Sequence, residues 1–265
     1  MTTTPDSTQA DSNTVRVEHT GAVTTITLDD PAKRNAINLS MRGQVVAALS
    51  EADASVDCRA VVITGAGGNF SAGGDLSSMN ADPGASRARL HAIADVIRAI
   101  VNCSKPVIAA VDGYAYGAGM SLAAACDVVV ASPEARFCCS FSGVGLTADA
   151  GLHWSLPARV GYGRARLLIM LGRPIDATDA HACGLVDELA DGPSLPAALA
   201  LAEALARRAP LSLAATKAIL AVDHASLDDI LALEGEAQGR LLASADFAEG
   251  RIAFFKKRRP RFEGR

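Results

Sequence analysis

Short apolar runs, each followed by a glycine-rich turn or a helix-forming segment, most constrain how this chain can fold. Residues 60–64, 106–111 and 127–131 are almost wholly apolar, which is typical of strands covered on both faces. Segments with helical spacing of apolar residues lie between them, for example Leu39–Ala54. The alternation predicts parallel β-α-β units with right-handed crossovers.

The two ends of the chain differ from this middle part. Residues 15–19 and 22–28 are β-rich runs around Thr20 and Gly21, which predicts a hairpin. From about Pro157 the strand signals fade, and helical patterns dominate at residues 194–208, 211–222, 226–244 and 246–256. We therefore expect a disordered tail over residues 1–14, an α/β core over 15–205 and a helical region over 206–265.

The composition excludes several classes of protein. With 49% hydrophobic residues, the chain of 265 residues can bury a large core. Its 25 basic and 29 acidic residues, with basic residues dense only at 256–261, give no general attraction to nucleic acid. Charged residues and glycines interrupt the longest apolar region, residues 106–131, so it is no membrane span. We expect a soluble cytoplasmic protein with neither nucleic acid nor membrane as a partner.

The cysteines and histidines predict no metal site. The six cysteines form no C-x-x-C pair, and the five histidines are scattered without the spacing of metal ligands. Reduced structural thiols are the expected state of the cysteines.

Two segments share the order apolar strand, glycines, helix start, at residues 63–75 and 111–120. Unpaired N–H groups at such places, together with the helix dipole, stabilise negative charge. If the two helix starts face each other, their N–H groups would together hold one oxygen atom. A dinucleotide-binding fingerprint fits poorly, because Phe70 and Leu122 stand where its third glycine belongs. Tight turns and close packing remain an alternative reason for the glycines.

Taken together, Ser-Ala-Gly-Gly-Asp at 71–75 and Gly-Tyr-Ala-Tyr-Gly-Ala-Gly at 113–119 resemble the paired oxyanion-hole loops of the crotonase (enoyl-CoA hydratase/isomerase) superfamily. Residues 30–38, 183–187 and 249–262 resemble further motifs of that family, so the resemblance covers residues 15–265. It implies an α/β fold, the crotonase (ClpP-like) spiral of repeated β-β-α units. It also implies a C-terminal helical trimerisation region, in a homotrimer or a dimer of trimers.

The resemblance also implies roles for individual residues. The backbone N–H groups of Ala72 and Ala118 match the two donors that hold the thioester oxygen as it becomes an enolate, each worth about 3–4 kcal/mol in a dry site. The acyl-CoA thioester is then the substrate, and no separate cofactor is expected. The positions that match CoA-binding residues are Lys33, Arg34, Ala36, Ala72 and Asp75, with Phe254 and Lys257 reaching the CoA of a neighbouring subunit.

Departures from the hydratase pattern indicate the reaction. Ser121 and Phe141 occupy the positions of the two hydratase glutamates, and neither can exchange a proton with water. Asp149 stands where an acid occurs in the related enoyl-CoA isomerases. One carboxylate beside an oxyanion hole suits proton transfer from C2 to C4 of a 3-enoyl-CoA. Apolar neighbours would raise the pKa of Asp149 toward the range of a general base. Asp149 could instead cap the helix that follows, or do both.

Other interpretations remain open. An enoyl-CoA hydratase is the alternative within the family, and a non-catalytic acyl-CoA-binding or RNA-binding homologue is the alternative from another class. A dehalogenase is disfavoured, since Arg98 stands where those enzymes carry a histidine base. His153 and Trp154 could line the acyl pocket or serve in packing, and Ser121 could bind a water or a substrate carbonyl or pack closely.

Overall fold

The computed structural model describes residues 14–76, 79, 82–222 and 225–265. Apart from Thr14, the tail that we expect to be disordered lies outside the described residues.

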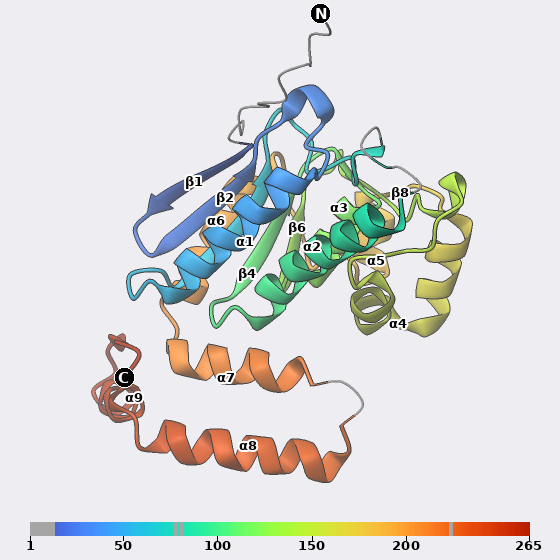
Figure 1. Ribbon diagram of the computed structural model, residues 1–265. Helices are drawn as coiled ribbons and strands as arrows, with labels where there is room; N and C mark the ends of the chain where they lie inside the picture. Colours follow the sequence, from blue (N-terminus) through green and yellow to red (C-terminus); the bar gives the residue numbers. More distant parts are fainter. Residues whose placement is uncertain (1–13, 77–78, 80–81, 223–224) are drawn as a thin grey trace, which may run out of the picture.

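A six-stranded sheet forms the centre of the molecule, with strand order β1-β2-β3-β4-β6-β9 (Figure 1). Its strands are β1 (Val15–Thr20), β2 (Val23–Leu28), β3 (Ala60–Gly65), β4 (Val107–Val111), β6 (Val128–Ala131) and β9 (Glu188–Leu189). The predicted hairpin is confirmed, because β1 and β2 pair antiparallel around Gly21, which has a φ of 57°. The remaining pairs are parallel, as the apolar runs predict.

A second, three-stranded sheet has the order β5-β7-β8. It consists of β5 (Tyr114–Tyr116), β7 (Arg136–Cys138) and β8 (Ile175–Asp176). Strands of two or three residues are too short to show a periodicity, so the sequence pattern does not predict them. Two strands of the first sheet are each followed by a short strand of the second and then by an α-helix, in the orders β4-β5-α3 (Ala118–Ala125) and β6-β7-α4 (Leu152–Leu171).

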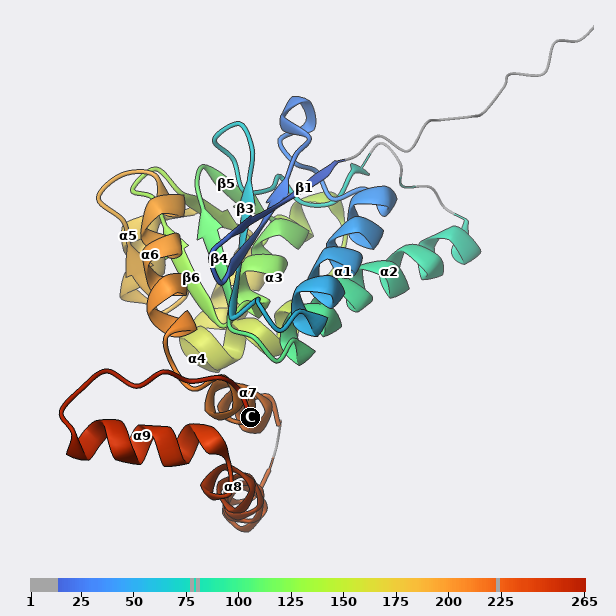
Figure 2. The same ribbon diagram turned by 90° about the vertical axis from the view of Figure 1, so that its left-hand side faces the viewer.

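Helices cover both faces of the large sheet (Figures 1 and 2). On one face, α1 (Leu39–Ala54) and α2 (Pro83–Asn102) contribute Met41 and Ile97 to the larger apolar core. On the other face, α6 (Ser194–Ala206) packs Ala198 and Ala202 against the sheet in a separate smaller core. Asn38 caps α1 by accepting a hydrogen bond from the Met41 N–H at 2.8 Å.

The last three helices lie away from the large sheet (Figures 1 and 2). They are α7 (Pro210–Leu220), α8 (Leu227–Leu242) and α9 (Ala245–Phe255), preceded in the chain by α5 (Ala177–Ala182) and α6. They expose large apolar side chains, among them Leu220, Leu227 and Phe254. Their use in trimerisation stays a prediction.

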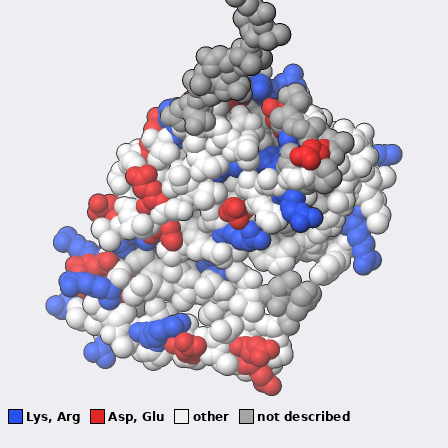
Figure 3. Space-filling view, in the orientation of Figure 1, with Lys and Arg blue, Asp and Glu red and all other residues white. Residues whose placement is uncertain are grey.

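Within the described residues, no helix combines the length and the apolar character needed to cross a membrane. The same part of the chain contains no group of three or more His, Cys, Asp and Glu residues placed to hold a metal ion. All six cysteines are free thiols, five of them buried. On the face shown in Figure 3, basic and acidic side chains are interspersed.

Candidate active site

The buried side chain of Asn35 holds the segment after β2 against the loop after β3. Its amide nitrogen donates to the carbonyl oxygens of Ala66 and Asn69 at 2.9 and 2.6 Å. The main-chain carbonyl oxygen of Asn35 accepts from the Ser71 hydroxyl at 2.8 Å. Asn35 has a φ of 55°, in the left-handed region that asparagine tolerates better than most residues. Asn35 has no role among the sequence-based predictions, although it lies inside the motif at residues 30–38.

The two glycine-rich loops are in direct contact. The Ser71 N–H donates to the Tyr114 carbonyl at 2.8 Å, and the Tyr116 N–H donates to the Ser71 carbonyl at 3.0 Å. A Cβ atom on Gly73 would lie 2.6 Å from the Tyr116 carbonyl oxygen, and one on Gly119 would lie 2.6 Å from that of Ser71. The absence of side chains at these two glycines therefore allows the loops to meet.

The backbone N–H groups in these loops differ in what they contact. Ala118 is the first residue of α3, whose initial N–H groups have no partner inside the helix. The Ala72 N–H, in contrast, donates to the Arg34 carbonyl at 2.9 Å. It is therefore engaged within the protein, which corrects the expectation that it is directed at a substrate oxygen. Gly74 lines the same cavity as Ala118, and neither of these N–H groups donates to another described residue.

That cavity has a volume of about 220 Å³. Its walls come from α1, the loop at residues 72–76, α2, the start of α3 and the segment 140–149. Asp149 lines it, and one carboxylate oxygen, Oδ1, is buried without a hydrogen-bond partner among the described residues. Burial raises the pKa of Asp149, and the positive charge of Arg42 partly opposes this. The structure therefore places one carboxylate, with an oxygen that lacks a hydrogen-bond partner among the described residues, and two unengaged N–H groups around one cavity.

A sharp backbone turn directs Asp149 toward the cavity. Ala150 and Gly151 have φ values of 51° and 70°, so two successive residues are left-handed immediately before α4. The Asp149 carbonyl accepts from the Leu152 N–H and the Ser121 hydroxyl, both at 3.1 Å. Gly151 is the N-cap of α4, and no side chain caps this helix. The alternative in which the Asp149 side chain serves as the cap is therefore not adopted.

The positions of the two hydratase glutamates hold no ionisable group. Ser121 is fully buried with its hydroxyl bonded to backbone, and Phe141 lines the cavity with 8% exposure. Of the described residues that line the cavity, the ionisable ones are Arg42, Arg89 and Asp149. Asp149 is therefore the one carboxylate among them.

Sequence reasoning missed Arg42. Its side chain is 4% exposed, and its guanidinium donates to the carbonyl oxygens of Ile37 at 3.0 Å and Arg89 at 2.9 Å. A signal was present, because Arg42 lies three residues before Val45 and seven before Leu49, on the apolar side of its helix. A charged residue at such a position is rarely buried without a specific reason.

The residues expected to bind CoA near the first loop lie together. Lys33 Nζ is 3.6 Å from a carboxylate oxygen of Asp75, and the Lys33 side chain is exposed. The Arg34 guanidinium lies over the Tyr114 ring at 5.7 Å from its centroid. Ala36 is buried beside them. Their proposed contact with CoA is not tested by this arrangement.

Phe254 and Lys257 belong to the end of α9 and the turn after it, away from the glycine loops within one chain (Figures 1 and 2). Phe254 is 77% exposed. Contact between these residues and CoA would require a second copy of the chain, as the resemblance implies.

Two aromatic candidates prove to lie elsewhere. His153 and Trp154 on α4 are exposed and do not line the cavity of Asp149. Trp154 instead borders a separate hollow beside Lys217 and Arg159. Neither residue therefore contributes to the wall of the cavity that holds Asp149.

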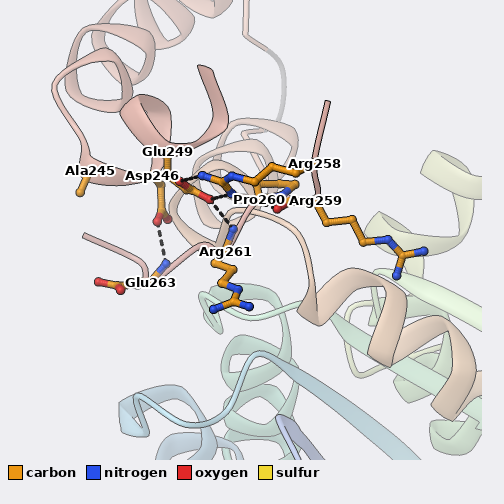
Figure 4. A pocket seen from close by; sticks show the side chains of 8 residues that line it. All are labelled: Ala245, Asp246, Glu249, Arg258, Arg259, Pro260, Arg261 and Glu263. Carbon is orange, nitrogen blue, oxygen red and sulfur yellow. Dashed lines mark hydrogen bonds and ion pairs between the residues drawn. The ribbon is translucent and has the colours of Figure 1, made fainter. Parts of the chain in front are cut away.

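A larger hollow of about 890 Å³ lies between α9 and the C-terminal segment (Figure 4). There the Arg258 guanidinium donates to both oxygens of Glu249 at 2.6 and 2.7 Å, and the Arg261 N–H adds a third bond at 2.8 Å. These hydrogen bonds, Arg258 first, lower the pKa of Glu249 to about 2. The side chains of Arg259 and Arg261 point away from this pair in Figure 4. Arg258 and Arg261, two of the basic residues at 256–261, thus hold the C-terminal segment against Glu249 of α9.

The fold and the paired loops define the class of protein. A solved structure titled as an enoyl-CoA hydratase from Polaromonas sp. JS666 superposes with a TM-score of 0.90 at 37% identity, covering 94% of this chain and 99% of that one. The architecture is therefore the crotonase fold, as the resemblance implies.

Sequence comparison leads to the family itself. The model of the enoyl-CoA hydratase/isomerase family matches residues 18–265. A probable enoyl-CoA hydratase of Rhodobacter capsulatus is 38% identical over 96% of this chain and 99% of its own length. The 1,2-epoxyphenylacetyl-CoA isomerase of Escherichia coli is 37% identical over 92% of this chain and 95% of its own. The chain belongs to the enoyl-CoA hydratase/isomerase family, whose members process acyl-CoA thioesters.

Proposed function

We propose that this protein isomerises 3-enoyl-CoA thioesters to 2-enoyl-CoA thioesters, with Asp149 as the only acid/base. The observation that carries the proposal is that Asp149, whose Oδ1 is buried without a hydrogen-bond partner among the described residues, lines the same cavity as Gly74 and Ala118, whose N–H groups are unengaged. A buried carboxylate oxygen without a partner is costly, so its retention in a cavity favours a chemical role.

The reaction needs one proton to leave C2 and return at C4. The Asp149 carboxylate removes the C2 proton, and the electron pair of that bond moves into the thioester carbonyl to give a dienolate. Asp149, now protonated, delivers the same proton to C4, and the double bond moves from C3–C4 to C2–C3. A base with a raised pKa suits this exchange, because the carboxyl group must accept the proton and then release it.

The dienolate oxygen would accept hydrogen bonds from Gly74 and Ala118. This pairing replaces the expected pair of Ala72 and Ala118, because the Ala72 N–H is engaged with Arg34. Both N–H groups belong to backbone held by the contact between the loops, so little reorganisation is needed when charge develops.

The CoA part of the substrate would lie along the first loop. Lys33 and Arg34 are exposed cations suited to CoA phosphates, and Asp75 lies beside Lys33. Phe254 and Lys257 would come from a neighbouring subunit in a homotrimer or a dimer of trimers. The apolar side chains exposed on α7, α8 and α9 support such an assembly.

Hydration is the competing function, and the names of several relatives favour it. Adding water across a double bond requires proton transfers to and from that water as well as to carbon. With Ser121 and Phe141 in the hydratase positions, Asp149 would have to serve both transfers alone.

Two substrates distinguish the functions. Purified protein is supplied with 3-hexenoyl-CoA, for conjugation, and with crotonyl-CoA, for hydration. The proposal predicts conjugation that Asp149→Asn and Asp149→Ala abolish, with hydration slower or absent. Hydration of crotonyl-CoA at a rate unaffected by Asp149→Ala would overturn it. A non-catalytic homologue would show neither reaction and would bind acyl-CoA equally well with Asn at 149.

A further inference from the structure

Arginines from two distant segments line one hollow of about 450 Å³, where the end of α6 meets the C-terminal segment. None of the described residues that line this hollow is acidic. Like charges gathered in one place repel one another, so such a group favours an anionic ligand. Two of the arginines directly follow α6 and two belong to the C-terminal segment: Arg207, Arg208, Arg259 and Arg261.

The guanidinium groups of these four arginines are not used to hold the fold. Within the part of the chain that the structure describes, none of them has a hydrogen bond or an ion pair with a protein group. Glu203 lies four residues before Arg207 on α6, but the two form no ion pair. In Figure 4 the side chains of Arg259 and Arg261 extend away from Glu249. All four side chains are exposed and therefore available to a ligand.

The acidic residues of the C-terminal part are engaged with other arginines. Glu249 accepts two hydrogen bonds from Arg258, and Glu263 pairs with Arg265 at 2.6 Å. Arg258 is the main cause of the low pKa of Glu249, and the charge of Arg261 adds a smaller effect. These carboxylates therefore leave most of the positive charge at the hollow uncompensated.

Other contacts fix the backbone around the hollow. Arg59 donates to the Phe262 carbonyl at 3.4 Å. The buried carboxylate of Asp246 accepts from the Glu263 and Gly264 N–H groups at 2.7 and 3.0 Å. The backbone is thus in place before a ligand binds, and only exposed side chains must be ordered.

Within one chain, the hollow and the active-site cavity lie at opposite ends of the large sheet. β3 ends at Gly65, beside the glycine-rich loops, whereas Arg59 immediately precedes this strand. α6 begins near the loop after β4, where the Ser194 N–H donates to Asp112 Oδ1 at 2.9 Å, and ends at the hollow. In Figure 2 the C-terminal segment runs past that end of α6, below the sheet. A strand of six residues is roughly 20 Å long.

We propose that this hollow binds a compact ligand with two or more linked phosphate groups, at a site separate from the acyl-CoA site. The planar arginine fork matches phosphate oxygens in bidentate geometry. Four guanidinium groups suit a ligand that carries several negative charges, and the size of the hollow favours a compact ligand over a long polymer. The bound phosphates bridge α6 and the C-terminal segment.

Calorimetry with tripolyphosphate at about 0.15 M ionic strength tests the site, because weak exposed interactions are screened there. The protein should bind one tripolyphosphate per chain, and the double variant Arg207→Gln/Arg208→Gln should bind about tenfold or more weakly. Arg164→Gln/Arg166→Gln is the matched control, since it removes two exposed arginines from α4 and should leave the affinity unchanged. Absence of binding by the wild-type protein, or equal weakening in both double variants, overturns the proposal.

Hydrogen exchange tests the bridge without any variant. Tripolyphosphate should slow exchange at residues 258–265, whereas sulfate at equal ionic strength should not. The effect should persist when the protein is saturated with hexanoyl-CoA, which cannot be isomerised. Displacement of tripolyphosphate by hexanoyl-CoA would show that the hollow belongs to the acyl-CoA site and would contradict a separate site. Both measurements are independent of the reaction catalysed, so failure of the isomerase proposal would leave their outcome unaffected.

Discussion

Arg42 and Asp149 face one cavity from different parts of the chain, and each keeps one buried polar atom, Nε and Oδ1, without a hydrogen-bond partner among the described residues. The guanidinium lowers the pKa of the carboxyl group that burial raises. The two groups are thus coupled electrostatically.

This coupling predicts how activity depends on pH. The base must be ionised, so kcat/KM for 3-hexenoyl-CoA should rise with pH through the raised pKa of Asp149 and then level off. Arg42→Gln removes a charge that favours the carboxylate, so the rising limb should move to higher pH. The exposed Arg87→Gln serves as control. A limb that moves to lower pH in Arg42→Gln would contradict the assignment of Asp149 as the base.

The Asp149 carboxyl group should lower the free energy of unfolding at neutral pH. Because the folded-state pKa of Asp149 is raised, the native state binds its proton more tightly than the unfolded state. The contribution of this group to the free energy of unfolding is therefore greatest below the unfolded-state pKa and falls as pH rises through the folded-state pKa. Asp149→Asn should raise the melting temperature relative to wild type by more at pH 8 than at pH 4. Asp57→Asn, at an exposed site, should show no such trend.

The role of Gly74 can be tested through its N–H group alone. Gly74→Pro removes the donor and should lower kcat by about 100-fold or more. Gly74→Ala keeps the donor, and its Cβ would meet only the mobile end of Met79 at 3.0 Å, so it should retain far more activity. Melting temperatures of both variants monitor the fold. If the two variants lose activity equally while folded, Gly74 is not an oxyanion donor.

The hydrogen-exchange protection of the C-terminal segment, residues 258–265, should depend on Glu249. Its pKa of about 2 keeps the carboxylate ionised, and hence bonded to Arg258 and Arg261, over the whole range from pH 4 to 8. In Glu249→Gln, hydrogen exchange at residues 258–265 should become faster. Glu236→Gln, which removes an exposed pair with Arg240 on α8, should leave that exchange unchanged. Unchanged exchange in both variants would show that other contacts anchor the segment.

The fold could be predicted from the sequence in segments where a periodic pattern of apolar residues extends over several residues. Parallel strands, the β1–β2 hairpin and the C-terminal helices follow from local periodicity and turn residues. Strands β5, β7 and β8 were missed, since their pairing depends on residues distant in the chain.

The site was predicted only in part, because the sequence motifs do not show how segments distant in the chain contact each other. The resemblance to the family predicted Ala118 and Asp149 as site residues, and both line one cavity, but it could not show that the Ala72 N–H bonds to Arg34, leaving Gly74 as the candidate donor. Nor could it show that Arg42, on the apolar side of its helix, opens onto the same cavity. Both facts depend on how two segments meet in space.

The most direct test of the account follows a label from C2 to C4. 3-Hexenoyl-CoA carrying deuterium at both C2 positions is converted in ordinary water, and the 2-hexenoyl-CoA product is analysed by NMR. The account predicts that part of the product carries deuterium at C4, because one carboxyl group removes and returns it, and that Asp149→Asn forms no product above background. Formation of 3-hydroxyhexanoyl-CoA as the first product, or isomerisation by Asp149→Asn at the wild-type rate, would contradict it.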